Sequence, residues 1–594
     1  MSLNSKAIHD VVHPTAAFVQ KSTYERADVL TENSPHSGPV KQGWVASQLN
    51  PKNRIDSLDI PSNPLWRIDG CAGLGTQFFA VPLFITPALP SRVDVFIPEQ
   101  STQTPEIRAL LQLDDAFHTK DRPRVANLAI TRLIVRKLQQ WTKTFPDPAA
   151  WYSSLPFGSR IVFENISLVL EDIRIRVAPM HNLERQLKSA DFLGQLWGQE
   201  QGHNIIFPPQ IPLSSLELVE QLHDSVCIVR FEDQKWILKA LTSYPKYIYH
   251  ELRNLLTIEP HENIITRPKY LATKRCSFGN KKAVVGFLVE YHEHGTLRDI
   301  LPLRRIHGLL SLSDQLRWSL QITSALLHLH ERCRLFYPDL RLDNVVLSAS
   351  GNAIIVDLEQ RGVWCEFSAP EVNFIQYMQI LAGSEDIPES VQSHFGARIK
   401  RLLRGFDDIA EFIGTEEHVQ LLPSYNIPWL CLTREEQEAA EVYMLGRVIW
   451  CIFEGVSAPH RTAFWQSYKW ESDLEFPNYR RTPGKIRDLI DRCTRGRRHT
   501  LSEQVGRVRS RLELSPDALR TIEADVDYTP EAYLHPIAKR WWKQEIQHAE
   551  DFLDEREEGI EEGRLPGNYF NRPSLKNLWA ELDEYRQEMG IARF

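Results

Sequence analysis

The stretch FYPDLRLDNVVL, residues Phe336 to Leu347, decides how the fold of this chain is interpreted. In it, Asp339 lies five residues before Asn344, and the run that follows is apolar, which is typical of a buried strand. A second apolar run, AIIVDLEQRG, contains Asp357, thirteen residues after Asn344. That spacing fits one hairpin that returns the chain to the same place. Whether these polar residues form a catalytic loop depends on the elements around them.

The elements around this stretch follow a definite order. VCIVRFEDQKWILKAL is typical of two strands around a polar turn, and YPKYIYHELRNLLTI is typical of an amphipathic helix. AVVGFLVEY predicts a buried strand, and SDQLRWSLQITSALLHLHERC predicts a long helix. After the hairpin, EAAEVYMLGRVIWCIFEG predicts an apolar helix that ends at a glycine. This order resembles the protein kinase family over about residues 212 to 510. The resemblance implies an α+β, bilobal fold with a small β-rich lobe and a large helical lobe.

The resemblance assigns residues to a nucleotide site. Lys239 in WILK matches the strand lysine that binds the α- and β-phosphates, and Glu251 in HELRNLL matches the helix glutamate that pairs with it. Glu290 and Tyr291 begin the segment that binds adenine. The implied cofactors are ATP and Mg²⁺. Three further positions are expected at the nucleotide: Val226, Ile237 and Val346.

The resemblance also assigns catalytic residues. Asp339 would accept or orient the proton of the substrate hydroxyl, and Arg341 would contact the γ-phosphate. Lys239, at the α- and β-phosphates, is the third expected catalytic residue. Asn344 and Asp357 would be ligands of Mg²⁺, which prefers hard oxygen atoms. Phosphoryl transfer depends on charge neutralisation and on the orientation of the reacting groups more than on covalent catalysis, so these residue types are sufficient for it.

Three later positions extend the resemblance. Ala369-Pro370-Glu371 matches the APE segment of the family. Glu441 replaces an aspartate that supports the backbone of the catalytic loop, and it is one methylene longer. Arg498, in CTRGRRHT, is expected to pair with Glu371.

The glycine-rich loop of the family is missing. No glycine occurs between Gly202 and Gly279, and Val219, Gln221 and Asp224 occupy the three glycine positions. Glycines allow the backbone to close over phosphates. Side chains at these positions hold the backbone away, and the Asp224 carboxylate repels phosphate.

Three other positions also depart from the family pattern. Ile237 replaces a small residue and adds bulk to the adenine site. Pro338 replaces the arginine that binds a phosphorylated activation loop, so control by loop phosphorylation is not expected. Glu359 replaces the glycine of the DFG segment, which restricts the backbone and adds negative charge near the metal.

These observations leave three functions open. The first is an ATP-dependent phosphotransferase, a divergent serine/threonine protein kinase that transfers the γ-phosphate to a protein hydroxyl. The alternative is a pseudokinase, a regulatory module that binds a protein partner with weak or no catalysis. A small-molecule kinase is a third option, because the segment from Asp357 to Glu371 is short and offers little platform for a peptide. The expected partner is a protein substrate or a regulated protein.

The sequence outside the resemblance suggests further parts. The expected division is a disordered leader at 1–65, an α+β region of unknown role at 66–205, a small lobe at 212–291, a large lobe at 292–510 with an insertion at about 373–436, and a helical C-terminal extension at 511–594.

Charged and aromatic segments lie in the last two parts. RIKRLLRGF, from Arg398 to Phe406, predicts a basic amphipathic helix that packs on the large lobe, with docking to an acidic partner as the alternative. The acidic stretch 545–562 is expected to be a solvated helix face. The C-terminal helices are expected to pack on the large lobe or the N-terminal region through Trp541, Trp542 and Trp579.

Composition limits the partners and the compartment. The chain has 594 residues and a net charge of −8, whereas nucleic acid and anionic membranes require a basic face, so neither is expected as the main partner. None of the eight cysteines forms a CxxC pair, which favours a reducing compartment. The N-terminus lacks the apolar region of a signal peptide, and no membrane span is predicted. The expected location is intracellular, cytoplasmic or nuclear.

Overall fold

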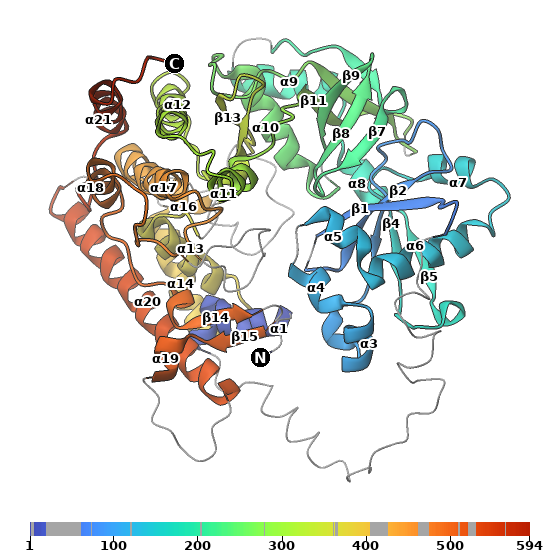
Figure 1. Cartoon of the computed structure of the whole chain (residues 1–594), viewed down its shortest axis with the longest axis horizontal. Helices are drawn as coiled ribbons and strands as arrows, with labels where there is room; N and C mark the ends of the chain where they lie inside the picture. The colour runs from blue at the N-terminus through green and yellow to red at the C-terminus, as the bar shows by residue number, and fades with distance from the viewer. Residues whose placement is uncertain are drawn as a thin grey trace, which may run out of the picture.

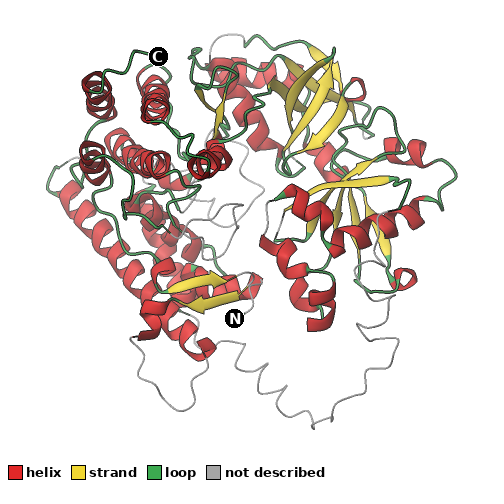
Figure 2. Cartoon of the chain, viewed as in Figure 1, coloured by secondary structure: helices red, strands yellow, loops and turns green. Residues whose placement is uncertain are grey.

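A computed structural model gives the chain an α+β architecture with mixed sheets, as the sequence predicts. Most strands belong to two large sheets, and helices make up most of the remainder (Figure 2). The structure describes residues 1, 5–18, 61–72, 74–118, 121–201, 205–240, 242–277, 279–359, 362, 366–403, 426–460, 474–508, 511–520, 530–564 and 566–594.

A five-stranded sheet forms the first unit (Figure 1). Its strands, in spatial and chain order, are β1 (Trp66–Ala72), β2 (Gln77–Pro82), β3 (Asp94–Phe96), β4 (Arg160–Phe163) and β5 (Ile175–Ala178). Only β3 and β4 are parallel. The helices of this unit are α3 (Pro105–Leu110), α4 (Leu113–His118), α5 (Arg122–Asn127), α6 (Ala129–Thr142) and α7 (Pro148–Ser154). Two further helices, α8 (His181–Gln186) and α9 (Ala190–Gln201), follow β5, and their buried residues belong to the core of the second sheet. The apolar face of α6 buries Leu133 and Ile134 in one core with Phe78 and Val95 of the sheet.

A six-stranded sheet forms the second unit. Its strands are β6 (Gln210–Pro212), β7 (Glu217–Gln221), β8 (Val226–Phe231), β9 (Gln234–Lys239), β10 (Tyr270–Arg275) and β11 (Lys282–Glu290). The spatial order is β6-β10-β11-β9-β8-β7, so β7 is an edge strand, and only β6 and β10 pair in parallel. Helix α10 (Pro245–Thr257) lies between this sheet and the short strand β13 (Ala353–Ile355) (Figure 1).

The second half of the chain is mainly helical. Its other elements are α11 (Leu297–Ile306), α12 (Leu312–Glu331), β12 (Val345–Leu347), α13 (Pro370–Ala382), α14 (Glu389–Leu402), α16 (Ile427–Leu430), α17 (Arg434–Glu454), α18 (Gly484–Cys493), β14 (Val505–Val508), β15 (Arg511–Leu514), α19 (Pro516–Arg520), α20 (Pro530–Glu561) and α21 (Leu575–Glu588). The predicted apolar helix is α17, which begins with a capping box between Thr433 and Glu436 and ends at Gly455 with φ 69°. Nearly all its residues are buried, so α17 is the central helix of this half.

The beginning of the chain corrects one expectation. Residues 1–65 were predicted to be a disordered leader, but Ser5–Ala17 forms short helical turns that are largely buried. The Trp542 indole donates a hydrogen bond of 2.9 Å to the Val11 carbonyl, and Leu512 donates one of 2.8 Å to the Met1 carbonyl. The segment therefore packs on α20 and β15, which lie beside it in Figure 1. Residues 19–60 of the expected leader lie outside the described residues.

The basic and acidic helices pair with each other. Arg398 on α14 is buried and lies 2.6 Å from Asp554 on α20, and His394 lies 2.8 Å from Glu550. Residues 398–403 of the predicted basic helix pack on α13 and α20, and residues 404–406 lie outside the described residues. The expectation that 545–562 is a solvated helix face holds at Asp554, whose side chain is 58% exposed, whereas Glu550 is half-buried beside α14 and Glu545 is buried.

The C-terminal helices pack as predicted. Trp541 and Trp542 are buried, and Trp579 packs against the same core. Helix α21 lies along α12, at the top left of Figure 1. None of the described helices combines the length and the apolar character that crossing a membrane requires.

Candidate active site

Lys239 is the centre of the polar cluster that the sequence predicts. It is the last residue of β9, where it is paired with Val226 and Phe287 on either side, and it is buried. Its Nζ lies 2.5 Å from Oε2 of Glu251 on α10 and also contacts the Asp357 carboxylate. The structure therefore brings together three residues that are separated by up to 118 positions in sequence.

Two carboxylates keep Lys239 charged. Burial alone lowers the pKa of a lysine, but the charges of Asp357 and Glu251 outweigh it and hold the pKa of Lys239 above its ordinary value. The ammonium is therefore a permanent positive charge at this point. A phosphate oxygen brought near it would be neutralised without a change of protonation.

Helix α10 fixes the segment that carries Asp357. Glu251 Oε1 accepts a hydrogen bond of 3.0 Å from the Leu358 N–H, and Asn254 Nδ2 donates one of 3.0 Å to the Leu358 carbonyl. The side chains of Glu251 and Asn254 are three residues apart, so they lie on one face of the helix. Asp357 itself has φ 65°, a left-handed conformation that aspartate tolerates better than most residues. Both backbone groups of Leu358 are thus bonded to one helix, and this orients Asp357.

Asp339 is the candidate base on the loop before β12. Asn344 Nδ2 donates hydrogen bonds to the Asp339 carbonyl at 2.9 Å and to its carboxylate at 3.0 Å, and Arg341 Nε lies 3.1 Å from the same carboxylate. Burial raises the pKa of Asp339 to about 7; Arg341 opposes this and Asp357 adds to it. A carboxylate with a pKa near neutrality is suited to accept a proton.

Asn344 fits the expected role at a cation. Its amide nitrogen makes both bonds to Asp339, so its amide oxygen is the atom that a cation would bind. The Val356 N–H donates a hydrogen bond of 3.0 Å to the Asn344 carbonyl, which places Asn344 next to the segment of Asp357. One amide oxygen and one carboxylate suit Mg²⁺, which takes the rest of its shell from water and phosphate.

Buried contacts hold the loop before Asp339 in place. The Tyr337 N–H donates a hydrogen bond to the Glu441 carboxylate, and the Tyr337 hydroxyl donates one to the Val356 carbonyl. Glu441, on α17, is fully buried and lies 2.7 Å from His330 Nε2. The longer side chain at position 441 therefore still reaches the loop backbone.

The expected adenine residues lie around the same strands. Val226 and Ile237 are half-buried on β8 and β9, where Ile237 is paired with Ile228 and Val289, and Val346 is half-buried on β12. Glu290 ends β11, and Tyr291 follows it. Val226, which is paired with Lys239, and Ile237, two residues before Lys239 on β9, offer partly exposed apolar surface, which suits a flat aromatic base.

The predicted partner of Glu371 is wrong. Arg498 instead lies 2.8 Å from Glu545 on α20. Arg572, from the segment between α20 and α21, binds Glu371 with both guanidinium nitrogens, at 2.5 and 3.0 Å. The sequence missed Arg572 because it lies beyond the region that carries the resemblance.

Two other residues add to the predicted set. Asn254 was missed, although its position three residues after Glu251 on a helix was a usable signal. Glu359 is buried and its charge acts on Lys239, so the polar cluster contains a third carboxylate beside those of Glu251 and Asp357.

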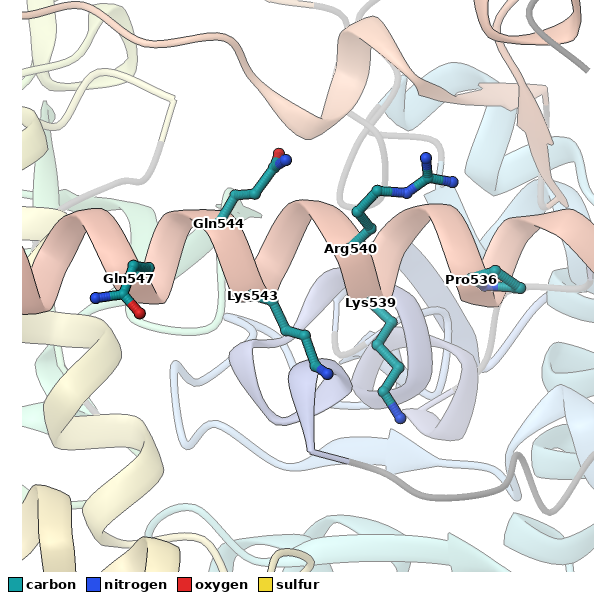
Figure 3. A pocket seen from close by; sticks show the side chains of 6 residues that line it. All are labelled: Pro536, Lys539, Arg540, Lys543, Gln544 and Gln547. Carbon is teal, nitrogen blue, oxygen red and sulfur yellow. The ribbon is translucent and has the colours of Figure 1, made fainter.

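A surface hollow occurs elsewhere, on α20. Figure 3 shows the six residues that line it: Pro536, Lys539, Arg540, Lys543, Gln544 and Gln547. All six come from one helix, and none of them belongs to the cluster around Lys239.

No model of a known protein family matches the chain, and no curated protein matches it either.

Proposed function

We propose that the chain is an ATP-dependent phosphotransferase, a divergent serine/threonine protein kinase with a bilobal kinase-like fold. In this proposal residues 212–291 form the small lobe and residues 292–510 the large lobe. The observation that carries the proposal is the contact of Lys239 with both Glu251 and Asp357, next to the loop of Asp339 and Asn344. Lys239 and Glu251 are buried charges, which are costly to keep without a function that uses them.

The proposed roles are those that the resemblance implies for these residues. Lys239 binds the α- and β-phosphates of ATP, and Arg341 contacts the γ-phosphate. Asp357 and Asn344 hold Mg²⁺, which supplies charge neutralisation at the phosphates. Asp339 takes the proton of the protein hydroxyl as the new P–O bond forms and the bond to ADP breaks.

Mg²⁺-dependent nucleotide binding tests the site directly. We expect Mg·ATP to raise the melting temperature, because a ligand that binds only the folded state stabilises it by mass action. At one hundred times the dissociation constant the gain is about 2.7 kcal/mol. Without Mg²⁺, or in Asp357→Ala, the shift should largely disappear. A shift of equal size under both conditions would contradict the assignment of Asp357 to the metal.

The pH dependence of the reaction tests Asp339. The base must be deprotonated to accept a proton, so kcat/KM should rise about tenfold per pH unit below a midpoint near pH 7 and level off above it. The measurement is the pH profile of phosphate transfer to a generic protein substrate. In Asp339→Asn the residual rate should lose this inflection, and an unchanged inflection would assign the titration to another group.

A pseudokinase is the second candidate, and Glu359 is the observation that favours it. A buried carboxylate beside Lys239 competes with phosphate for the lysine. In that case the chain binds a protein partner, and the binding persists in Lys239→Met and Asp357→Asn. Loss of cellular function in these two variants, with the fold intact, would exclude this candidate.

A further inference from the structure

The five-stranded unit contacts the outer edge of β7, the strand that leads into the expected phosphate-covering hairpin (Figure 1). An edge strand presents backbone groups that have no neighbouring strand to bond. Here the Leu218 N–H donates a hydrogen bond of 2.7 Å to the Ala88 carbonyl. The edge of β7 is therefore covered by another part of the same chain.

Asp69 and Arg67 of β1 make the most specific of these contacts. Asp69 Oδ2 accepts a hydrogen bond of 2.8 Å from the Gln221 N–H, and Arg67 Nη2 donates one of 2.8 Å to the Val219 carbonyl. Arg67 also binds Asp69 with two nitrogens, Nε at 2.5 Å and Nη2 at 3.1 Å. Asp69 is buried, so its hydrogen bond to Gln221 is shielded from water.

These two backbone contacts fall at positions where the family has glycine. Val219 and Gln221 are the first two of the three residues that replace the missing glycines. The register of pairing between β7 and β8 shifts between Leu218 and Glu220, so Val219 has no partner residue on β8. The five-stranded unit thus hydrogen-bonds to the β7–β8 hairpin at the positions where a glycine-rich loop would be flexible.

A second ion pair extends the contact toward the expected adenine segment. Arg122, at the start of α5, pairs with Glu220 of β7. Both charges act on Tyr291, the residue that follows β11.

We propose that Arg67 and Asp69 are positioning residues for the nucleotide: they hold the β7–β8 hairpin at a fixed height over the ATP phosphates, in place of closure by a glycine loop. Glycines give a loop the backbone freedom to close over a nucleotide. A hairpin that Arg67 and Asp69 already fix in its binding conformation does not need this freedom, because it does not move when the nucleotide binds. The proposal rests on the proposed function and gives the first unit a role within it.

The test compares Asp69→Ala with the natural sequence in the full chain. The alanine leaves the Gln221 N–H without its acceptor, so we expect the amides of residues 217–226 to exchange hydrogen faster. The KM for Mg·ATP should rise about tenfold, as loss of a hydrogen bond to a charged group does, while kcat changes less than about twofold. General damage to the fold would reduce the fraction of active protein, which lowers the apparent kcat and leaves the KM unchanged.

Two matched variants complete the experiment. Asp69→Asn keeps an oxygen that can accept from Gln221 and should restore most of the affinity. Asp114→Asn removes a charge of the same unit that pairs with Arg108 at 2.7 Å, away from β7, and should change neither exchange nor KM. An unchanged KM in Asp69→Ala, or an equal rise in Asp114→Asn, overturns the proposal. If the natural sequence binds no Mg·ATP, the proposed function fails and the nucleotide role with it, and hydrogen exchange alone then decides whether Asp69 holds the hairpin.

Discussion

Replacing Arg572 by alanine is expected to lower the free energy of unfolding by about 3–5 kcal/mol, the usual cost of leaving one member of a buried ion pair alone. Arg572 and Glu371 are both buried. Besides the bidentate pair, Arg572 donates to the carbonyls of Ala439 at 2.9 Å and Arg495 at 3.0 Å. Its guanidinium lies 4.8 Å from the centre of the Tyr443 ring.

Chemical denaturation of the full chain measures this loss. The midpoint of the transition that includes the helical half should fall in Arg572→Ala with little change in slope. Arg492→Ala is the matched control, because the side chains of Arg492 and its partner Glu581 are both more than one-third exposed and their pair should be worth less than about 1 kcal/mol. A larger loss in Arg492→Ala than in Arg572→Ala would contradict the assignment. Removing both charges, in Glu371→Gln with Arg572→Met, should cost less than Arg572→Ala alone.

Asp339→Ala is expected to lower the rate of phosphate transfer by about 10²- to 10⁴-fold, the usual contribution of a positioned general base. The variant also removes one of the two hydrogen bonds that the Asn344 amide donates to residue 339, the one to the carboxylate, and keeps the one to the backbone carbonyl. Lys239, Glu251 and Asp357 keep their contacts with one another, so Mg·ATP should still raise the melting temperature.

Radiolabelled ATP with a generic protein substrate gives the rate, and thermal shift in the same samples gives binding. Persistence of binding with loss of transfer separates chemistry from affinity. Asp299→Asn serves as the control, because its carboxylate is largely exposed and pairs with Arg298 outside the cluster. Equal, near-background transfer by the natural sequence and Asp339→Ala would contradict the kinase proposal and leave the pseudokinase as the better account.

Contacts between neighbouring elements could be predicted from the sequence. The spacing from Asn344 to Asp357 predicted one hairpin, and β12 and β13 form it. The apolar run that ends at Gly455 predicted α17, because a periodic pattern and a capping residue act locally. The contact of Lys239 with Glu251 and Asp357 was predicted from the order of elements that resembles the protein kinase family. Such a resemblance carries information on contacts between distant residues, which hydrophobic periodicity does not.

Contacts between distant segments could not be predicted. Arg572, and not Arg498, is the partner of Glu371, which lies 201 positions away in sequence. The residues next to each arginine in the sequence are polar in both cases, so the local sequence does not indicate which arginine binds Glu371. The segment Ser5–Ala17 is short, and its apolar residues, such as Ile8, Val11 and Val12, do not indicate which part of the chain covers them, so its burial depends on the surface that α20 offers. The hydrogen bonds of Arg67 and Asp69 to β7 go to backbone groups, which leave no mark in the sequence.

The contact between Val11 and Trp542 has a consequence for synthesis of the chain. The two residues are 531 positions apart, so at the usual rate of translation the first waits about half a minute to two minutes for the second. During that time Val11 and its apolar neighbours have no surface to pack on, and Glu371 lacks Arg572 for part of the same interval. The helical half thus completes its fold only after the ribosome has delivered residues that lie beyond Trp542. A nascent chain stalled before that point presents exposed apolar surface to chaperones.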